Sequence, residues 1–60
     1  MRLSAQAKFR RRVKTYLAQN DLTMTGLARS IGRRRDTVST EVNSGPRFPR
    51  VRALILDRIA

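Results

Sequence analysis

The chain of 60 residues contains no cysteine and no histidine. Without cysteine it forms no disulfide, and without either residue it lacks the usual ligands of a structural zinc ion. A domain this short buries a modest share of its surface, and such domains usually need a disulfide, a metal or oligomerisation for stability. Only oligomerisation remains, so we expect a surface that contacts a second copy of the chain.

Acidic residues are also scarce. Four Asp and Glu stand against fourteen Lys and Arg, which gives a formal net charge of +10, and twelve of the fourteen are arginine. Such a charge favours polyanions, above all nucleic acid and secondarily an anionic membrane surface. The planar guanidinium group suits bidentate hydrogen bonds to phosphate and guanine, which favours nucleic acid. The alternative is a surface that only keeps the protein in solution, although solubility is better served by both signs of charge.

The residues needed for catalysis are missing as well. General acid–base and nucleophilic catalysis require paired, partly desolvated groups, and the four acids are scattered among arginines. Gly26 and Gly32 are not followed by the Gly-Lys-Ser/Thr of a phosphate-binding loop. We therefore expect no enzymatic activity, no cofactor, no metal site and no small-molecule substrate.

Long apolar runs are absent. The longest, residues 53–56, is far shorter than the roughly 20 residues of a membrane-spanning helix, and no apolar run of the signal-peptide kind is visible. We expect a single domain over residues 1–60 with no membrane partner. Its expected location is the cytoplasm, in association with the nucleoid, or the host cytoplasm if a phage encodes it.

The apolar spacing predicts a first helix within residues 1–21, with Ser4 as its N-cap. The helix should end at Asn20-Asp21, because Asn tolerates the left-handed conformation found after a helix. One face of it is apolar and should enter the core: Phe9, Val13, Tyr16 and Leu17. The remaining positions are basic, and they are either solvated or in contact with phosphate: Lys8, Arg10, Arg11, Arg12 and Lys14.

Two short helices should follow on either side of a turn at Gly32, where a positive φ is accessible to glycine. Leu22 is expected in the core and Thr23 as the N-cap of the first of the two. The buried residues are expected to be Leu27, Ala28 and Ile31 in that helix, and Val38 and Val42 in the next. The opposite face of the later helix carries charged, hydroxyl and amide groups: Arg35, Asp36, Ser39, Thr40 and Asn43.

A last helix should begin at Phe48-Pro49, after a turn at residues 44–46, because proline is well tolerated in a first turn. It carries five large aliphatic residues: Val51, Leu54, Ile55, Leu56 and Ile59. This is more than one face of a small core usually takes. Either all five close the core of the monomer, or Leu56 and Ile59 contact a second copy.

The segment LTMTGLARSIGRRRDTVSTEVNSG resembles the helix-turn-helix of the Cro and repressor family of phage and bacterial regulators. The resemblance rests on Leu27, Ala28, Ile31 and Gly32, followed by Val38 six residues after the glycine. It implies an all-α domain of four helices, with the helix-turn-helix at about residues 23–43 and a DNA-recognition helix at 34–43. Three positions differ from the family pattern: Arg33 replaces an apolar residue, Arg34 replaces a Ser or Thr N-cap, and Glu41 replaces an apolar or small residue.

The resemblance also implies residue roles. Base edges in the major groove would be contacted by Arg34, Arg35, Asp36, Ser39 and Thr40. Phosphates would be contacted by Thr25, Arg29, Arg33, Thr37, Asn43 and Arg47. Three arginines at a helix start oppose the helix dipole, which is understandable if an anionic partner binds there.

These observations predict a sequence-specific protein that binds double-stranded DNA, a phage or prophage transcriptional repressor that acts as a homodimer. Two alternatives remain open: a DNA-bending architectural or recombination-directionality factor, and a cationic membrane-active peptide. RNA binding is less favoured, because the three aromatic residues, Phe9, Tyr16 and Phe48, are expected in the core rather than available for base stacking.

Overall fold

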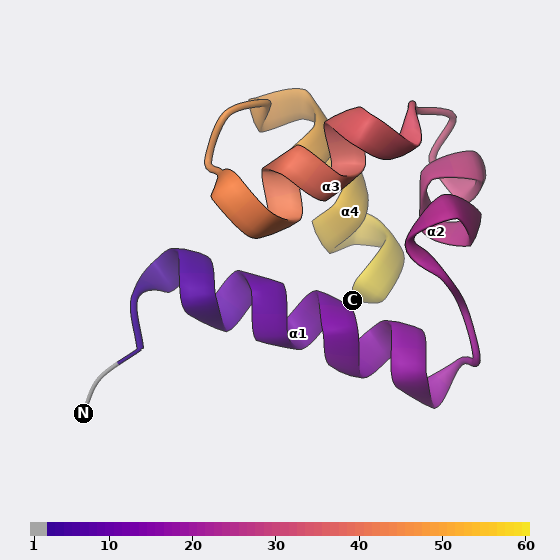
Figure 1. Cartoon of the computed structure of the whole chain (residues 1–60), viewed down its shortest axis with the longest axis horizontal. Coiled ribbons are helices and arrows are strands. Elements are labelled where there is room, and N and C mark those ends of the chain that lie inside the picture. The colour runs from indigo at the N-terminus through magenta and orange to yellow at the C-terminus, as the bar shows by residue number, and fades with distance from the viewer. Residues whose placement is uncertain (1–2) are drawn as a thin grey trace.

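The computed structural model describes residues 3–60, which form four helices and no strand (Figure 1). The helices are α1 (Ala5–Gln19), α2 (Met24–Ser30), α3 (Arg35–Ser44) and α4 (Pro49–Ile59). This confirms the expected all-α fold. The first helix was predicted over residues 1–21, but α1 is shorter, at Ala5–Gln19. Residues 1 and 2 of that prediction lie outside the described part of the chain. No helix within residues 3–60 is long and apolar enough to cross a membrane.

The core lies where the four helices meet, and α3 packs against each of the other three. Figure 1 shows α1 along one side of the domain, with α3 and α4 on the other. The expected apolar faces are confirmed, except that Tyr16 and Ile31 are only partly buried. The buried apolar residues are Phe9, Val13, Leu17, Leu27, Ala28, Val38, Val42, Val51, Ile55 and Ile59.

Three of the helices begin at residues well suited to a helix start. The Ser4 hydroxyl accepts a hydrogen bond from the Ala7 N–H at 3.0 Å, and the Thr23 hydroxyl accepts one from the Gly26 N–H at 3.1 Å. Both satisfy a backbone donor that the helix itself cannot pair. Pro49 occupies the first turn of α4, where its missing N–H costs nothing. The two N-caps and the proline start are confirmed, whereas α3 begins without a side-chain cap.

The first two helices end with the same hydrogen-bond pattern. After α1, the Leu22 N–H donates to the Leu17 carbonyl at 2.8 Å, and after α2 the Arg33 N–H donates to the Ala28 carbonyl at 2.9 Å. Each closure needs one left-handed residue. In the second case it is Gly32, at φ 67°, as predicted; in the first it is Asp21, at φ 53°, and not the expected Asn20.

Two apolar residues are more exposed than the sequence predicts. Leu22, expected in the core, is 40% exposed, because the left-handed turn at Asp21 places it on the surface beside Gly26. Phe48, also expected in the core, is 38% exposed, although its backbone N–H donates to the buried Glu41 carboxylate. In α4 the buried residues are Val51, Ile55 and Ile59, while Leu54 and Leu56 are partly buried. Ile59 is only 9% exposed, so it belongs to the core of the monomer.

Candidate nucleic-acid interface

The start of α3 is fixed by the closure of α2. Because the Gly32 and Arg33 N–H groups bond back to carbonyls of α2, the chain reverses and leaves Arg33 and Arg34 in an exposed turn. Arg34 has the extended backbone of an N-cap, at φ −69° and ψ 142°, but its side chain makes no capping hydrogen bond. The helix predicted at 34–43 therefore begins at Arg35 and ends at Ser44. Its first N–H groups receive no hydrogen bond from an N-cap side chain.

The five residues predicted to contact bases lie at the start and along the outer side of α3. Arg34, Arg35 and Asp36 are exposed, and Ser39 and Thr40 are partly buried. At about 3.6 residues per turn, residues 36, 40 and 43 lie opposite Val38 and Val42, and Ser39 lies at the edge between the two sides. Arg35 was expected on the opposite side, but three residues before Val38 it lies on the same side as the two valines, exposed at the first position of the helix. The Arg35 guanidinium lies 3.8 Å from the Asp36 carboxylate, and both side chains are exposed. The pair is therefore weak and free to rearrange.

Five of the six residues predicted to contact phosphates fall into two groups at opposite ends of α3. Thr25, Arg29 and Arg33 belong to α2 and the turn after it; Asn43 and Arg47 lie at the other end, and Thr37 is between them. All are exposed except Thr37, which is partly buried. The ten residues of α3 span about 15 Å at 1.5 Å per residue. The two groups thus bracket α3 at its two ends.

A side-chain hydrogen bond and a shallow hollow shape this surface further. The Asn43 amide donates to the Ser39 hydroxyl at 3.2 Å, which links two of the predicted residues one turn apart. On the neighbouring helix, Arg10 and Asn43 line a shallow hollow together with Ser4, Gln6 and Ala7. Arg10 therefore adds a positive charge from α1 beside the end of α3, a contribution that sequence spacing alone does not reveal.

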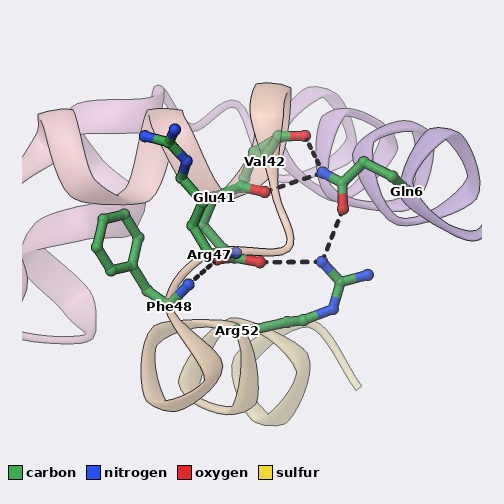
Figure 2. Close-up of polar contacts among 6 residues, drawn as sticks. All are labelled: Gln6, Glu41, Val42, Arg47, Phe48 and Arg52. Atoms are coloured by element: carbon green, nitrogen blue, oxygen red, sulfur yellow. Dashed lines mark hydrogen bonds and ion pairs between the residues drawn. The ribbon is translucent and has the colours of Figure 1, made fainter.

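Behind this surface, Glu41 is a fully buried acid on the inner side of α3. One carboxylate oxygen accepts hydrogen bonds from the Arg47 N–H at 2.9 Å and the Phe48 N–H at 2.5 Å (Figure 2). The other oxygen lies 3.0 Å from the Arg52 guanidinium of α4. Glu41 thereby joins α3, the following loop and α4. Glu41 is thus a structural residue of the interior and not part of the exposed surface.

Gln6 joins α1 to the same group of residues. Its amide nitrogen donates to the Glu41 and Val42 carbonyls at 2.9 and 2.7 Å, and its amide oxygen accepts from Arg52 at 2.9 Å (Figure 2). The Arg52 guanidinium also lies over the Phe9 ring, 3.9 Å from its centroid. Among residues 3–60, no buried side-chain nitrogen or oxygen lacks a hydrogen-bond partner. We call Gln6, Glu41 and Arg52 the polar anchor of α3.

The carboxylate of the polar anchor is ionised at neutral pH. Burial raises the pKa of Glu41, but the hydrogen bonds from the Phe48 and Arg47 N–H groups and from Arg52 lower it by more. The pKa of Glu41 therefore lies below its ordinary value. Because both partners of the ion pair are charged, removal of either one would leave a buried charge without compensation.

The anchor was missed from the sequence, although one signal was available. Val38, Glu41 and Val42 share one side of a helix at this spacing, so an acid there faces the interior. Its partners, Gln6 and Arg52, are 35 and 11 residues away and could not be identified without the fold.

Within residues 3–60 no cluster of acidic side chains could hold a metal ion. A scan against models of protein families finds no match, and searches of curated proteins and of solved structures find none either. Any function proposed for the chain therefore depends on its own residues and their geometry.

Proposed function

We propose that the chain is a sequence-specific double-stranded DNA-binding protein with a Cro/repressor-like helix-turn-helix, in which α2 and α3 are the two helices of the motif. In this proposal α3 enters the major groove. The protein acts as a transcriptional repressor, with two copies of the chain bound to DNA.

The observation that carries the proposal is the start of α3. Arg33, Arg34 and Arg35 are exposed there, beside backbone N–H groups that no N-cap side chain satisfies. A helix N-terminus without such a cap, surrounded by guanidinium groups, suits a phosphate or the edge of a guanine. The arginines oppose the helix dipole in the free protein, and a bound polyanion would remove that cost.

The outer side of α3 supplies groups that can distinguish bases. Arg35 can donate two hydrogen bonds to guanine O6 and N7, and Asp36 can accept one from cytosine N4 or orient Arg35. Ser39 and Thr40 can contact a base edge or a thymine methyl group. Because Arg35 and Asp36 are held only by a weak exposed pair, they can separate in the groove at little cost.

The bracketing residues would hold the phosphates on either side of the groove. Arg29 in α2 and Arg33 in the turn after it lie before the start of α3, and Arg47 lies beyond its far end, while Arg10 adds a fourth cation near Asn43. Such contacts fix the position of the protein on the duplex without reading sequence.

A pair of chains is expected because one module of this size reads few base pairs. Two half-sites about one helical turn apart would give useful affinity and specificity. Of the two residues considered for the dimer contact, Ile59 is in the core, so Leu56, which is partly buried, is the better candidate.

The test is selection from a library of random duplexes at physiological salt. We expect a consensus with two-fold symmetry, and an affinity for it that falls steeply between about 50 and about 200 mM salt. Failure to enrich any sequence, or binding that hardly responds to salt, would contradict the proposal. A circular-permutation gel shift on the selected site then distinguishes a repressor from a factor whose main effect is to bend DNA.

Two single substitutions test the residue roles on the selected site. Arg35→Ala should relax base preference at one position by about 1–3 kcal/mol, because a bidentate contact with guanine is lost. Arg29→Ala should weaken binding to all sequences alike, because a phosphate contact carries no sequence information. The measurement is a binding profile over all single-base variants of the site. Identical profiles for the two variants would show that the roles are wrongly assigned.

A further inference from the structure

The outer face of α1 carries four exposed cations: Lys8, Arg11, Arg12 and Lys14. We call this set the α1 basic face. The helix contains no acidic residue. Within residues 3–60 the ion pairs are Arg35–Asp36 and Arg52–Glu41, so none includes a cation of α1. The four charges are therefore not neutralised by ion pairs within the described part of the protein.

This arrangement opposes the stability of α1. Lys8 lies three and four residues before Arg11 and Arg12, and Arg11 lies three residues before Lys14, so like charges face each other along the helix. None of the four lies in the last turn, where the helix dipole would favour a cation. A bound polyanion would remove this repulsion, which makes the face a candidate binding surface.

The position of the face separates it from α3. Because Phe9, Val13 and Leu17 pack toward α3 and α4, the opposite side of α1 points away from α3 (Figure 1). The outer side of α3 also points away from the core. The domain measures 34 × 25 × 18 Å, whereas DNA has a persistence length of about 150 base pairs. One duplex in contact with α3 would have to bend sharply around the domain to reach the α1 basic face.

We propose that the α1 basic face binds the phosphate backbone of a second DNA duplex, so that the protein holds two duplex segments together. The inference rests on the proposed function, because the first segment is the one bound by α3. The span from Lys8 to Lys14 is about 9 Å along the helix. Phosphates of one strand recur about every 3.4 Å of duplex axis, so the face meets two or three of them.

The composition of the face favours a duplex over an anionic membrane. A helix that lies in a membrane interface inserts apolar side chains, and those of α1 are already used in the core. Apart from its cations, the exposed positions of α1 are Ala5, Thr15, Ala18 and Gln19, none of which is a large apolar residue. Leu3, just before the helix, is exposed beside these cations, but a single leucine supplies little of the apolar area by which such a helix inserts. Phosphate contact through long cationic side chains needs no such insertion.

The test is a capture experiment in which one short duplex is fixed to beads and a second, labelled duplex of unrelated sequence is in solution. Full-length protein at about 50 mM salt should retain the labelled duplex on the beads. Lys8→Gln/Arg11→Gln should still bind the beads but retain about fivefold less labelled duplex per bound protein.

The matched control, Arg50→Gln/Arg58→Gln on α4, also lowers the net charge by two and should retain as much labelled duplex as the wild type. Both pairs replace exposed arginine or lysine by a good helix former, and folding is checked by circular dichroism.

Each contrary result has its own meaning. Capture by Lys8→Gln/Arg11→Gln equal to that of the wild type would overturn the inference, since the second duplex would then be held elsewhere, for instance by α3 of a second copy. Wild type that binds the beads without capturing the labelled duplex would overturn it as well and leave the proposed function intact. Wild type that does not bind the beads would refute both. Flotation with phosphatidylglycerol vesicles that is lost in Lys8→Gln/Arg11→Gln, without duplex capture, would assign the face to a membrane instead.

Discussion

The two ends of α3 are held in opposite ways. Near its C-terminal end, Glu41 is fully buried and accepts hydrogen bonds from the next loop and from α4, while Gln6 holds the neighbouring carbonyls. At its N-terminal end, Arg34 provides no capping hydrogen bond, and three arginines are exposed. One end is fixed by the protein itself, and the other has N–H groups that no cap side chain satisfies. Both properties suit the recognition role that we propose for α3, because a rigidly placed helix presents unsatisfied groups in a defined position.

The largest effect should follow from breaking the anchored end. Glu41→Ala leaves Arg52 without its carboxylate and two loop N–H groups without an acceptor. We expect a loss of about 3–5 kcal/mol in the free energy of unfolding, which is comparable to the whole stability of a small domain. Helical circular dichroism and urea titration measure it. Glu41→Gln keeps the volume and one acceptor oxygen and should cost less. Glu41→Leu/Arg52→Met should recover only the part of the loss due to the unpaired Arg52 charge, because the two loop N–H groups still lack an acceptor. A urea midpoint for Glu41→Ala equal to that of the wild type would contradict the role of the anchor.

A second way to break the anchored end is to fill the space beside it. A Cβ at Gly45 would lie 2.7 Å from the Glu41 Oε2 atom and closer still to the Glu41 carbonyl oxygen. Gly45→Ala should therefore destabilise the protein by about 1–3 kcal/mol in the same urea titration, because backbone must move. Gly26→Ala is the matched control: there the new Cβ meets only ordinary contacts, the nearest at 3.5 Å, and α2 should gain about 0.5–1 kcal/mol. Equal effects of the two substitutions would show that the contact with Glu41 is unimportant.

The pH dependence of stability should distinguish the buried acid from the exposed ones. Because the pKa of Glu41 is lower in the folded protein than in the unfolded chain, its contribution is present above the unfolded value, about 4.3, and is lost as pH falls through the folded value. Urea titrations at a series of pH values should show this loss in the wild type. In Glu41→Gln the loss over the same range should be smaller. The same dependence in both proteins would mean that another acid is responsible.

The sequence was sufficient to predict the parts of the fold that depend on local rules. Ser4, Thr23, Gly32 and Pro49 are helix boundaries with a simple local cause, and each was predicted. The apolar spacing likewise identified the buried face of every helix.

What the sequence did not reveal depends on contacts between distant residues. The polar anchor joins positions 6, 41 and 52, and an acid in a helix is usually exposed, so Glu41 was taken only as a departure from a family pattern. Leu22 and Phe48 were expected in the core because they are apolar, yet the backbone turns beside them place both side chains partly in solvent. Of the residues expected on the outer side of α3, Asp36 and Asn43 are exposed there, Ser39 and Thr40 are partly buried, and Arg35 is exposed at the helix start instead. Their contacts with bases and phosphates remain predictions.

The smallest effect, and the most specific, should come from closing the open end of α3. Arg34 already has the backbone conformation of an N-cap, so Arg34→Ser places a hydroxyl where it can accept from the N–H of residue 36 or 37. The free energy of unfolding should rise by about 0.5–1 kcal/mol, while DNA affinity falls, because a cation is lost and an N–H group is occupied. Arg34→Ala separates the two effects, since it removes the same charge without adding a cap. It should weaken DNA binding without the gain in stability.

If Arg34→Ser were no more stable than Arg34→Ala, the N-terminal end of α3 would not be open in the way described. If instead it bound DNA as tightly as the wild type, that end would not be where the partner binds.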